Sequence, residues 1–341
     1  MTPVAPALRV LIARIAELSA RLGEGVTIDP LAVIDRSADL DLAPPGLFSP
    51  NRACRLVPAM DGWIAVNLAR EDDAELIAAW LETTVEGDPW ATILAVAART
   101  PRNDLLWRAR LLGLPVASVR ETAGKDMRPT VIALGRRKNQ TGVARGLRVV
   151  DLSNLWAGPL CGDILARCGM AVVKVESRNR PDGGRETAFF ERLNRNKSRV
   201  TLDFAEDDDR VRLRTLVCEA DVVITGARPR AFRQLGLDPK IVFAANPHLV
   251  WVAITGYGWT GEGADRVSFG DDGAAAGGLL ATAPDGTPRF LGDALADPLT
   301  GLAAAAGALE AVDQGGGVLV DAALARTAAG AARLIAGRKA A

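Results

Sequence analysis

Histidine is almost absent from this sequence, which contains a single one, His248. A histidine-rich metal site is therefore excluded, and a Ser-His-Asp triad would have to use this one side chain. The four cysteines include no Cys-x-x-Cys pair, which argues against a disulfide framework and a cysteine zinc site and is typical of a reducing compartment. Acid, base or nucleophilic work is consequently left to carboxylates, unless a cysteine does it. His248 itself precedes an apolar stretch and is interpreted as a packing residue at a strand boundary.

The sequence also lacks net charge and long apolar runs. Its 41 Lys and Arg residues balance 41 Asp and Glu residues, so a protein that binds nucleic acid over its whole surface is not expected. No apolar run approaches the roughly 18 to 20 residues that a membrane span needs. Near the N-terminus Arg9, Arg14 and Arg21 interrupt the apolar pattern, which predicts an amphipathic helix and not a signal peptide. We therefore expect a cytoplasmic protein without a membrane or nucleic-acid partner.

The composition is that of a folded protein, with 49% hydrophobic and 24% charged residues in a chain of 341. Residues 1–135 are interpreted as a smaller α+β region. Strand-like segments at 54–57 and 63–68 flank an Asp-Gly turn, which predicts a hairpin. Helices are expected after it at 71–81, 90–99 and 103–112.

The segment 136–146 is polar, basic and glycine-bearing, and it predicts a linker into a second domain over 147–341. There, buried strands at 147–152 and 171–176 flank a helix, which indicates a parallel sheet. Further strands are expected at 199–204, 221–225, 249–254 and 318–324, and an alanine-rich helix at 299–312. The predicted fold class is α/β, with a Rossmann-like parallel sheet in the large domain beside the smaller α+β domain. The first strand-to-helix turn lacks Gly-x-Gly-x-x-Gly, so a classical dinucleotide site is not expected.

Five stretches of the second domain follow one another in an order that is recognisable. They lie at 147–176, 194–203, 220–237, 246–258 and 296–301, and include Asn194-Arg195-Asn196-Lys197-Ser198 and Ala296-Asp297-Pro298-Leu299-Thr300-Gly301. Together they resemble the class III CoA-transferases, the family of formyl-CoA transferase and carnitine CoA-transferase.

The first region resembles the smaller domain of that family at 49–51, 61–66 and 111–115. In the family this domain follows the catalytic aspartate, whereas here it comes first, so the segment order looks permuted. The resemblance implies a homodimer, and family members form interlocked ones. Whether a second chain completes the site is left open by the changed order.

The resemblance places Asp297 at the family's catalytic aspartate, which carries acyl and CoA groups covalently. A carboxylate suits this chemistry because it attacks a thioester without a general base. The structural alternative is that Asp297 caps a helix ahead of Pro298, and the two roles are compatible. Asp293 is the main competitor for the catalytic role.

Two adjacent acids, Asp271 and Asp272, lie near the place where transferases of this family keep an acidic residue facing the nucleophile. The alignment puts Gly270 at that place, and a slip of one residue would put Asp271 there. A turn or helix cap explains the same pair without a site role. The family's glycine-rich covering loop would correspond to 44–49, which has one glycine, Gly46, and reads equally well as a plain loop.

Coenzyme A, as a substrate, carries a 3′-phosphate and a pyrophosphate and therefore needs positive charge around it. The resemblance implies that it lies along the first turn of the second domain and against basic side chains beyond it. The residues in question are Leu155, Trp156, Ala157, Arg178, Arg180, Lys197, Arg228 and Arg233. The family's Asn-Phe pair is replaced by Gly226-Ala227, which removes an aromatic surface for adenine. A solvated basic face is the alternative interpretation.

The resemblance thus implies an enzyme that moves CoA between an acyl-CoA and a free carboxylic acid through an aspartyl intermediate, without a permanently bound cofactor or a metal. An acyl-CoA racemase or epimerase of the same superfamily is the alternative, although Phe269 stands where related racemases have a histidine. A non-catalytic CoA-binding protein is the third hypothesis, motivated by the altered order and by Gly46, Gly226 and Ala227.

Overall fold

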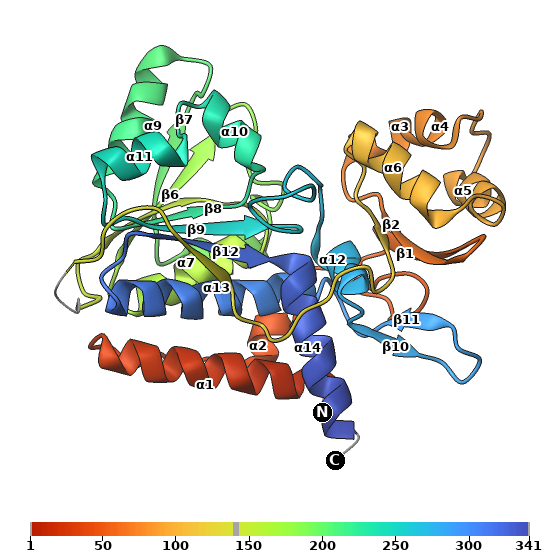
Figure 1. Cartoon of the computed structure of the whole chain (residues 1–341), viewed down its shortest axis with the longest axis horizontal. Helices are drawn as coiled ribbons and strands as arrows, with labels where there is room; N and C mark the ends of the chain where they lie inside the picture. Colours follow the sequence, from red (N-terminus) through yellow and green to blue (C-terminus); the bar gives the residue numbers. More distant parts are fainter. Residues whose placement is uncertain (1, 139–142, 340–341) are drawn as a thin grey trace.

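A seven-stranded sheet forms the centre of the larger part of the molecule (Figure 1). The computed structural model describes residues 2–138 and 143–339, so part of the predicted linker at 136–146 lies outside the described residues. In spatial order the strands are β4 (Thr130–Ala133), β12 (Val318–Ala323), β9 (Val250–Thr255), β8 (Val222–Thr225), β5 (Arg148–Leu152), β6 (Ala171–Ser177) and β7 (Ser198–Leu202). Only β4 is antiparallel to its neighbour.

The six parallel strands, counted along the chain from β5, lie in the order 3-2-1-4-5-6. This is the order of the doubly wound α/β fold, in which the direction of winding reverses between the first and fourth strands, here β5 and β8. The prediction of an α/β fold with a large parallel sheet is confirmed, and each predicted strand of this sheet is present within two residues of its predicted bounds.

Alternation along the strands separates two faces of the sheet. In β9, Val250 and Val252 face one core, whereas Trp251 and Ala253 face the other. The first core is covered by α7 (Ala157–Arg167) and α13 (Ala296–Asp313), and the second by α9 (Asp207–Glu219), α10 (Pro229–Gln234) and α11 (Pro239–Ala245). Figure 1 shows these two layers below and above the sheet.

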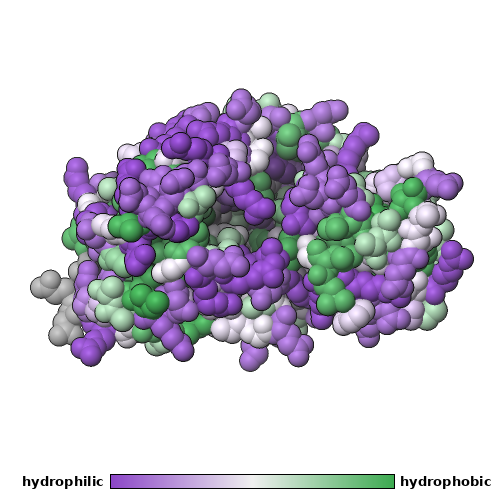
Figure 2. Space-filling view, turned by 90° about the horizontal axis from the view of Figure 1, so that it is seen from above, coloured by the Kyte–Doolittle hydropathy of each residue, from purple (hydrophilic) through white to green (hydrophobic). Residues whose placement is uncertain are grey.

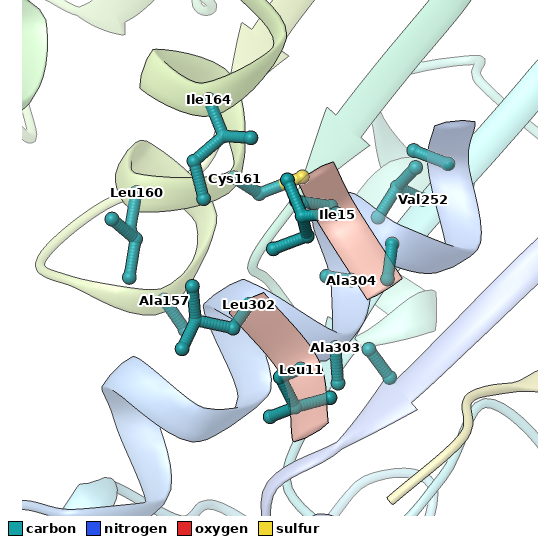
Figure 3. Packing of buried hydrophobic residues seen from close by; sticks show 14 of the residues in the cluster. Leu11, Ile15, Ala157, Leu160, Cys161, Ile164, Val252, Leu302, Ala303 and Ala304 are labelled. Carbon is teal, nitrogen blue, oxygen red and sulfur yellow. The ribbon is translucent and has the colours of Figure 1, made fainter. Parts of the chain in front are cut away.

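The first helix, α1 (Ala5–Arg21), adds a further layer beneath α13. Its Leu11 and Ile15 point toward α7 and α13, among the buried side chains Ala157, Leu302 and Ala303 (Figure 3). The predicted amphipathic helix is therefore confirmed, and its apolar face belongs to the core of the large sheet. The C-terminal helix α14 (Leu324–Lys339) packs against α12, α13 and α1.

The smaller part holds a three-stranded antiparallel sheet of β1 (Cys54–Ala59), β2 (Gly62–Asn67) and β3 (Val116–Ser118). The predicted hairpin is confirmed by the pairing of β1 with β2. Four helices cover this sheet, α3 (Glu71–Glu75), α4 (Ile77–Leu81), α5 (Pro89–Ala97) and α6 (Arg102–Leu112). The single helix predicted at 71–81 is wrong, because the segment is interrupted at Leu76, where α3 ends and α4 begins. The start of α3 is fixed by the bond from Arg70 N to Asp73, and α4 buries Trp80 and Leu81.

The first 135 residues contribute to both parts, since α1 and β4 belong to the larger one. Conversely α12 (Gly270–Ala276), from the second half of the chain, packs against β2 and β3. The division of the chain at 136–146 therefore stays a prediction. The remaining elements are α2 (Pro30–Ile34), α8 (Ala188–Asn194), β10 (Leu280–Thr282) and β11 (Pro288–Phe290). Among the described residues, no helix has the length and apolar character that crossing a membrane requires.

Candidate active site

The turns that follow β5 and β8 touch each other at the point where the winding of the sheet reverses. A Cβ atom on Gly226 would lie 3.4 Å from Ser153 Cα, and one on Gly158 would overlap the Ser153 side chain. Leu155, in the turn that follows β5, has a positive φ of 68°, and its N–H donates to Asp182 Oδ2 at 2.9 Å. Ligands of doubly wound sheets bind in the crevice at such a reversal. Leu155 and the backbone of the first turn lie at this reversal, and their contact with CoA stays a prediction.

Asp297 lies at the start of α13, on this same edge of the sheet. One turn later, a Cβ atom on Gly301 would be 2.7 Å from Ala157 O, so α13 approaches the start of α7 closely. The helix begins at Ala296 with Leu295 as its N-cap, so Asp297 is not a cap and that alternative is wrong. Its carboxylate is half-buried and stands in the first helical turn, where the helix dipole favours negative charge.

Three further carboxylates gather around Asp297. The Asp271 Oδ1 accepts the N–H of Ala294 at 2.8 Å, and the Asp293 Oδ2 accepts Arg36 Nε at 2.7 Å. Asp272 is fully buried and accepts Asn67 Nδ2 at 2.8 Å. The carboxylates thus come from the start of α12, from the start of α13 and from the turn just before α13. Arg36 and Asn67 come from the first 70 residues of the chain.

The burial of this cluster perturbs three of the four acids. Burial raises the pKa of Asp297 to about 7, an effect that Arg36 opposes and that Asp271, Asp272 and Asp293 increase. Burial also raises the pKa of Asp271 to about 6, with Asp293 contributing, and the pKa of Asp272 to about 7. The pKa values of these three acids lie near neutrality because they are buried close to other carboxylates. Such clusters are typical of functional sites.

Of these four acids Asp297 is half-buried, whereas the other three are buried. Asp271 and Asp272 are 2% and 0% exposed, so the predicted second acid cannot be either of them by direct contact with a substrate in this structure. Gly270 faces the carboxylate of Asp297, since a Cβ atom there would overlap Asp297 Oδ2. Asp293 is 6% exposed and ion-paired with Arg36 at 2.6 Å, which disfavours it as the nucleophile.

Four arginines converge on the side of the crevice toward the smaller part. Burial lowers the pKa of Arg228. Three further arginines, Arg230, Arg70 and Arg180, lower it more, and Asp265 opposes them, so these charged groups lie near one another. No ion pair of Arg228, Arg230 or Arg180 is formed among the described residues. Arg70 also stacks over Phe269 at 5.9 Å, next to the acids of α12. Seen from above, the molecule is hollowed between its two parts, and hydrophilic side chains surround the hollow (Figure 2).

Cations held close together favour the binding of an anion, because it relieves their mutual repulsion. The contact of Arg180 and Arg228 with a phosphate-bearing ligand stays a prediction, with which their proximity is consistent. Arg178 lies near Asp209 of α9, and Arg233 is exposed on α10. Neither is among the arginines that lower the pKa of Arg228.

Two predicted CoA contacts are unsuited to that role. Lys197 is buried, and its three N–H groups donate to Asp151 Oδ2, Pro159 O and Asn194 Oδ1 at 2.8 to 2.9 Å, which leaves none for a phosphate. Burial opposes the charge of Asp151, but Lys197 and the nearby Lys174 lower the pKa of Asp151 to about 2. Lys197 therefore fixes β7 against the first turn of the domain.

Trp156, the N-cap residue of α7, is 2% exposed, so its ring offers no open surface to a ligand. One edge of the ring meets Phe189 at 5.0 Å, and Arg36 covers one face at 4.4 Å from the centroid. Its role in this structure is to hold Arg36 beside Asp293. Ala157, also buried, contributes its backbone to the contact with Gly301.

The sequence did not single out Arg36, Asn67, Arg70 or Arg230. Asn51 lay inside the stretch 49–51 that resembles the family's smaller domain, so a signal existed for it, but not for its role. Arg36 and Asn67 have no local motif, since their partners Asp293 and Asp272 are distant along the chain. The loop at 44–49 is bonded to β11 through Gly46 O and Phe290 N at 2.9 Å, which makes it part of the wall beside the acids.

Within the described residues no group of His, Cys, Asp or Glu side chains is arranged to hold a metal ion. A separate cavity of about 1190 Å³ lies between α1, α13 and α14 and contains none of the four acids. The candidate site is therefore assigned by its chemistry, at the start of α13.

Comparison with known proteins identifies relatives of the second half of the chain. A model of CoA-transferase family III matches residues 145–337. A succinyl-CoA–D-citramalate CoA-transferase of Chloroflexus aurantiacus is 35% identical over 190 residues, which cover 51% of this chain and 47% of that protein. A succinate–glutarate CoA-transferase of Agrobacterium fabrum is 32% identical over 203 residues, covering 52% and 50%. The chain thus spans about half the length of the curated relatives it matches.

A solved structure agrees with this relationship. The crystal structure of a CaiB/BaiF family protein from Brucella suis superimposes with a TM-score of 0.51 and 33% identity, covering 56% of this chain and 55% of that one. The matched family region contains the doubly wound sheet and Asp297, whereas Arg36, Asn51 and Asn67 precede it. The permuted order of segments stays a prediction.

Proposed function

The chain belongs to CoA-transferase family III, and on that premise we propose that it moves CoA between an acyl-CoA and a free carboxylate, with Asp297 as the nucleophile. The observation that carries this proposal is the position of Asp297, half-buried in the first turn of α13 at the edge where the winding of the sheet reverses, together with Arg180, Arg228 and Arg230, which form no ion pair among the described residues. An acyl-CoA bound in the crevice, with the phosphates of its CoA part toward the arginines, would bring its thioester carbonyl to the edge of the sheet where Asp297 lies.

The reaction proceeds through four balanced steps. The Asp297 carboxylate attacks the thioester carbonyl, the C–S bond breaks, and CoA leaves as the thiolate while a mixed anhydride forms. The thiolate then attacks the aspartyl carbonyl of the anhydride and releases the donor acid as a carboxylate, which leaves an aspartyl-CoA thioester. The acceptor carboxylate attacks this thioester and frees the thiolate again. Attack of the thiolate on the acceptor's carbonyl gives the new acyl-CoA and restores Asp297.

The chain's own residues supply what these steps require. Arg180 and Arg228, with Arg70 and Arg230, provide charge for the phosphates of CoA. The backbone N–H groups at the starts of α12 and α13 are candidate donors for the oxyanion that develops on the carbonyl under attack. Since the nucleophile must be ionised and the pKa of Asp297 is raised to about 7, the rate of attack should rise between pH 6 and pH 8.

The relatives guide the choice of substrates. Their names describe succinyl, citramalate, succinate and glutarate groups, so short dicarboxylic acids and their CoA thioesters are the first candidates for donor and acceptor. The homodimer, the cytoplasmic location and coenzyme A as a transient substrate belong to the same proposal.

Trapping of the aspartyl intermediate tests the proposal. The protein is incubated with succinyl-CoA, quenched, and examined by intact-mass spectrometry with and without hydroxylamine. We expect a hydroxylamine-sensitive adduct that maps to Asp297 and is missing in Asp297→Asn. Asp285→Asn, in an exposed turn, is the matched control and should keep the adduct.

Other outcomes would overturn the assignment. Exchange of the α-proton of a branched acyl-CoA with deuterated water, without an adduct, would establish the racemase. Binding of CoA with neither adduct nor exchange would leave a CoA-binding protein.

A further inference from the structure

The turn that leads into α13 has a strained backbone. Ala294 has a positive φ of 44°, in the left-handed region that residues with a Cβ atom disfavour. Asp297 is tied to this turn directly, because its N–H donates to Ala294 O at 2.9 Å. A strained turn of this kind persists only where the surrounding contacts fix it. The position of the Asp297 carboxylate consequently depends on what holds residues 293 and 294.

Two carboxylates hold the turn from opposite sides. Asp271, in α12, accepts the N–H of Ala294 at 2.8 Å. The side chain of Asp293 belongs to the turn itself, and Arg36 holds its Oδ2 at 2.7 Å. Both carboxylates are nearly buried, at 2% and 6% exposure, so their mutual repulsion is poorly screened by water. A neutral donor between them would relieve this repulsion without adding charge.

Asn51 provides that donor. Its Nδ2 donates one hydrogen to Asp271 Oδ2 at 2.9 Å and the other to Asp293 Oδ1 at 2.8 Å. The amide oxygen accepts from Ser49 Oγ at 2.8 Å and from Ala53 N at 2.9 Å. Every donor and acceptor of the amide is therefore used, and a reversed amide would point its oxygen at two carboxylates.

We propose that Asn51 is a positioning residue for Asp297, because its amide bridges Asp271 and Asp293 and thereby fixes the strained Ala294 turn that presents the nucleophile. We call these two hydrogen bonds the Asn51 bridge. Asn51 precedes β1 and lies outside the region matched by the family model, at 145–337. The first 135 residues thus help to build the catalytic geometry of the second half. The effect on the reaction rests on the proposed function, whereas the effect on the turn does not.

The first measurement is amide hydrogen exchange of the full chain, followed by mass spectrometry of peptides spanning 288–300. In Asn51→Ala we expect exchange at the Ala294 turn to accelerate about tenfold or more, because the bridge no longer restrains it. Asn246→Ala is the matched control, since Asn246 is also half-buried but bonds Ala220 O at the far end of the sheet. Its exchange over 288–300 should match that of the unaltered protein.

The second measurement is the single-turnover rate of Asp297 adduct formation with succinyl-CoA. In Asn51→Ala this rate should fall on the order of 10²-fold, as displacement of a reacting group by about 1 Å does, while the Kd for CoA changes less than about threefold. Asn51→Asp should be worse, because it places a third acid beside Asp271 and Asp293. The double variant Asn51→Asp with Asp271→Asn returns a donor to the pair and should recover part of the rate.

The outcomes separate the two proposals. Unchanged exchange at the Ala294 turn in a folded Asn51→Ala protein overturns the Asn51 bridge, whatever the activity. An unchanged adduct rate in a variant with faster exchange overturns its positioning role. If the unaltered protein forms no adduct but exchange still responds, the proposed function fails while the bridge stands as a structural device. Absence of recovery in the double variant would contradict the charge argument.

Discussion

At the scale of single residues, the pairing of Asp272 with Asn67 is incomplete in an informative way. One oxygen of each side chain, Asp272 Oδ2 and Asn67 Oδ1, is buried without a hydrogen-bond partner. Both atoms are acceptors when the acid is ionised, so the pair lacks a donor. A proton on Asp272 would supply one, which agrees with burial raising the pKa of Asp272 to about 7.

Replacement of Asp272 by asparagine should therefore stabilise the protein at alkaline pH. The raised pKa means that the folded state binds more protons than the unfolded state between about pH 4 and pH 7, so the stability contributed by protonated Asp272 is lost as pH rises through 7. Asp272→Asn carries a permanent donor and should increase the free energy of unfolding by roughly 2 kcal/mol at pH 8. Urea titrations at pH 5 and pH 8 measure this difference. An equal effect at both pH values would contradict it.

Site residues could be predicted from the sequence where a short motif carried the information. Asp297 was found from its neighbours at 296–301, and Arg228 from the pair Arg228-Pro229. Arg36 and Asn51 reach Asp293 across 257 and 242 positions of sequence, and no local pattern encodes such contacts. The error at Lys197 has the same origin, because a lysine in a basic stretch does not reveal that its ammonium is buried against Asp151.

At the scale of secondary-structure elements, the contact between α7 and α13 connects the first turn of the sheet to Asp297. Gly301 makes this contact possible, because a Cβ atom there would be 2.7 Å from Ala157 O and 3.2 Å from Leu160 Cβ. Gly301→Ala should force the helices apart and lower the free energy of unfolding by about 1 to 3 kcal/mol, despite the better helix propensity of alanine.

Chemical denaturation of that variant should be compared with Gly337→Ala in α14, where nothing lies within 4 Å of the added atom. This control should be neutral or stabilise by about 0.5 to 1 kcal/mol. A Gly301→Ala protein as stable as the control would show that α7 and α13 do not constrain each other.

The elements that the sequence predicted well are those with a strong pattern of their own. The parallel strands are short runs of β-branched residues that are buried on both faces, as in β8. In contrast, β4 has mostly exposed residues and becomes a strand only because its backbone pairs with β12. The β10–β11 hairpin, also missed, consists of two three-residue strands.

At the scale of the whole molecule, α1 belongs to the core of the sheet that lies more than a hundred residues further along the chain. Leu8 is 0% exposed in this core, whereas Val10 on the same helix is 46% exposed. Leu8→Ala should destabilise the entire chain by roughly 2 to 5 kcal/mol, and Val10→Ala should change its stability by less than about 0.5 kcal/mol.

Urea unfolding followed by both circular dichroism and tryptophan fluorescence checks this prediction. The two signals should shift together in Leu8→Ala, because the helix and the sheet share one core. A shift in neither signal, with only local fraying of α1, would mean that the N-terminal helix is not a structural part of the large domain.

The path of the chain between α1 and β4 has a consequence for turnover. Both elements pack on the larger part of the molecule, so the segment between them is anchored there at both of its ends. The conformational entropy of bringing Arg36, Asn51 and Asn67 to the aspartates is therefore lost once, when the protein folds. If the proposed function holds, each incoming acyl-CoA would meet side chains that are already in place and would not have to order them.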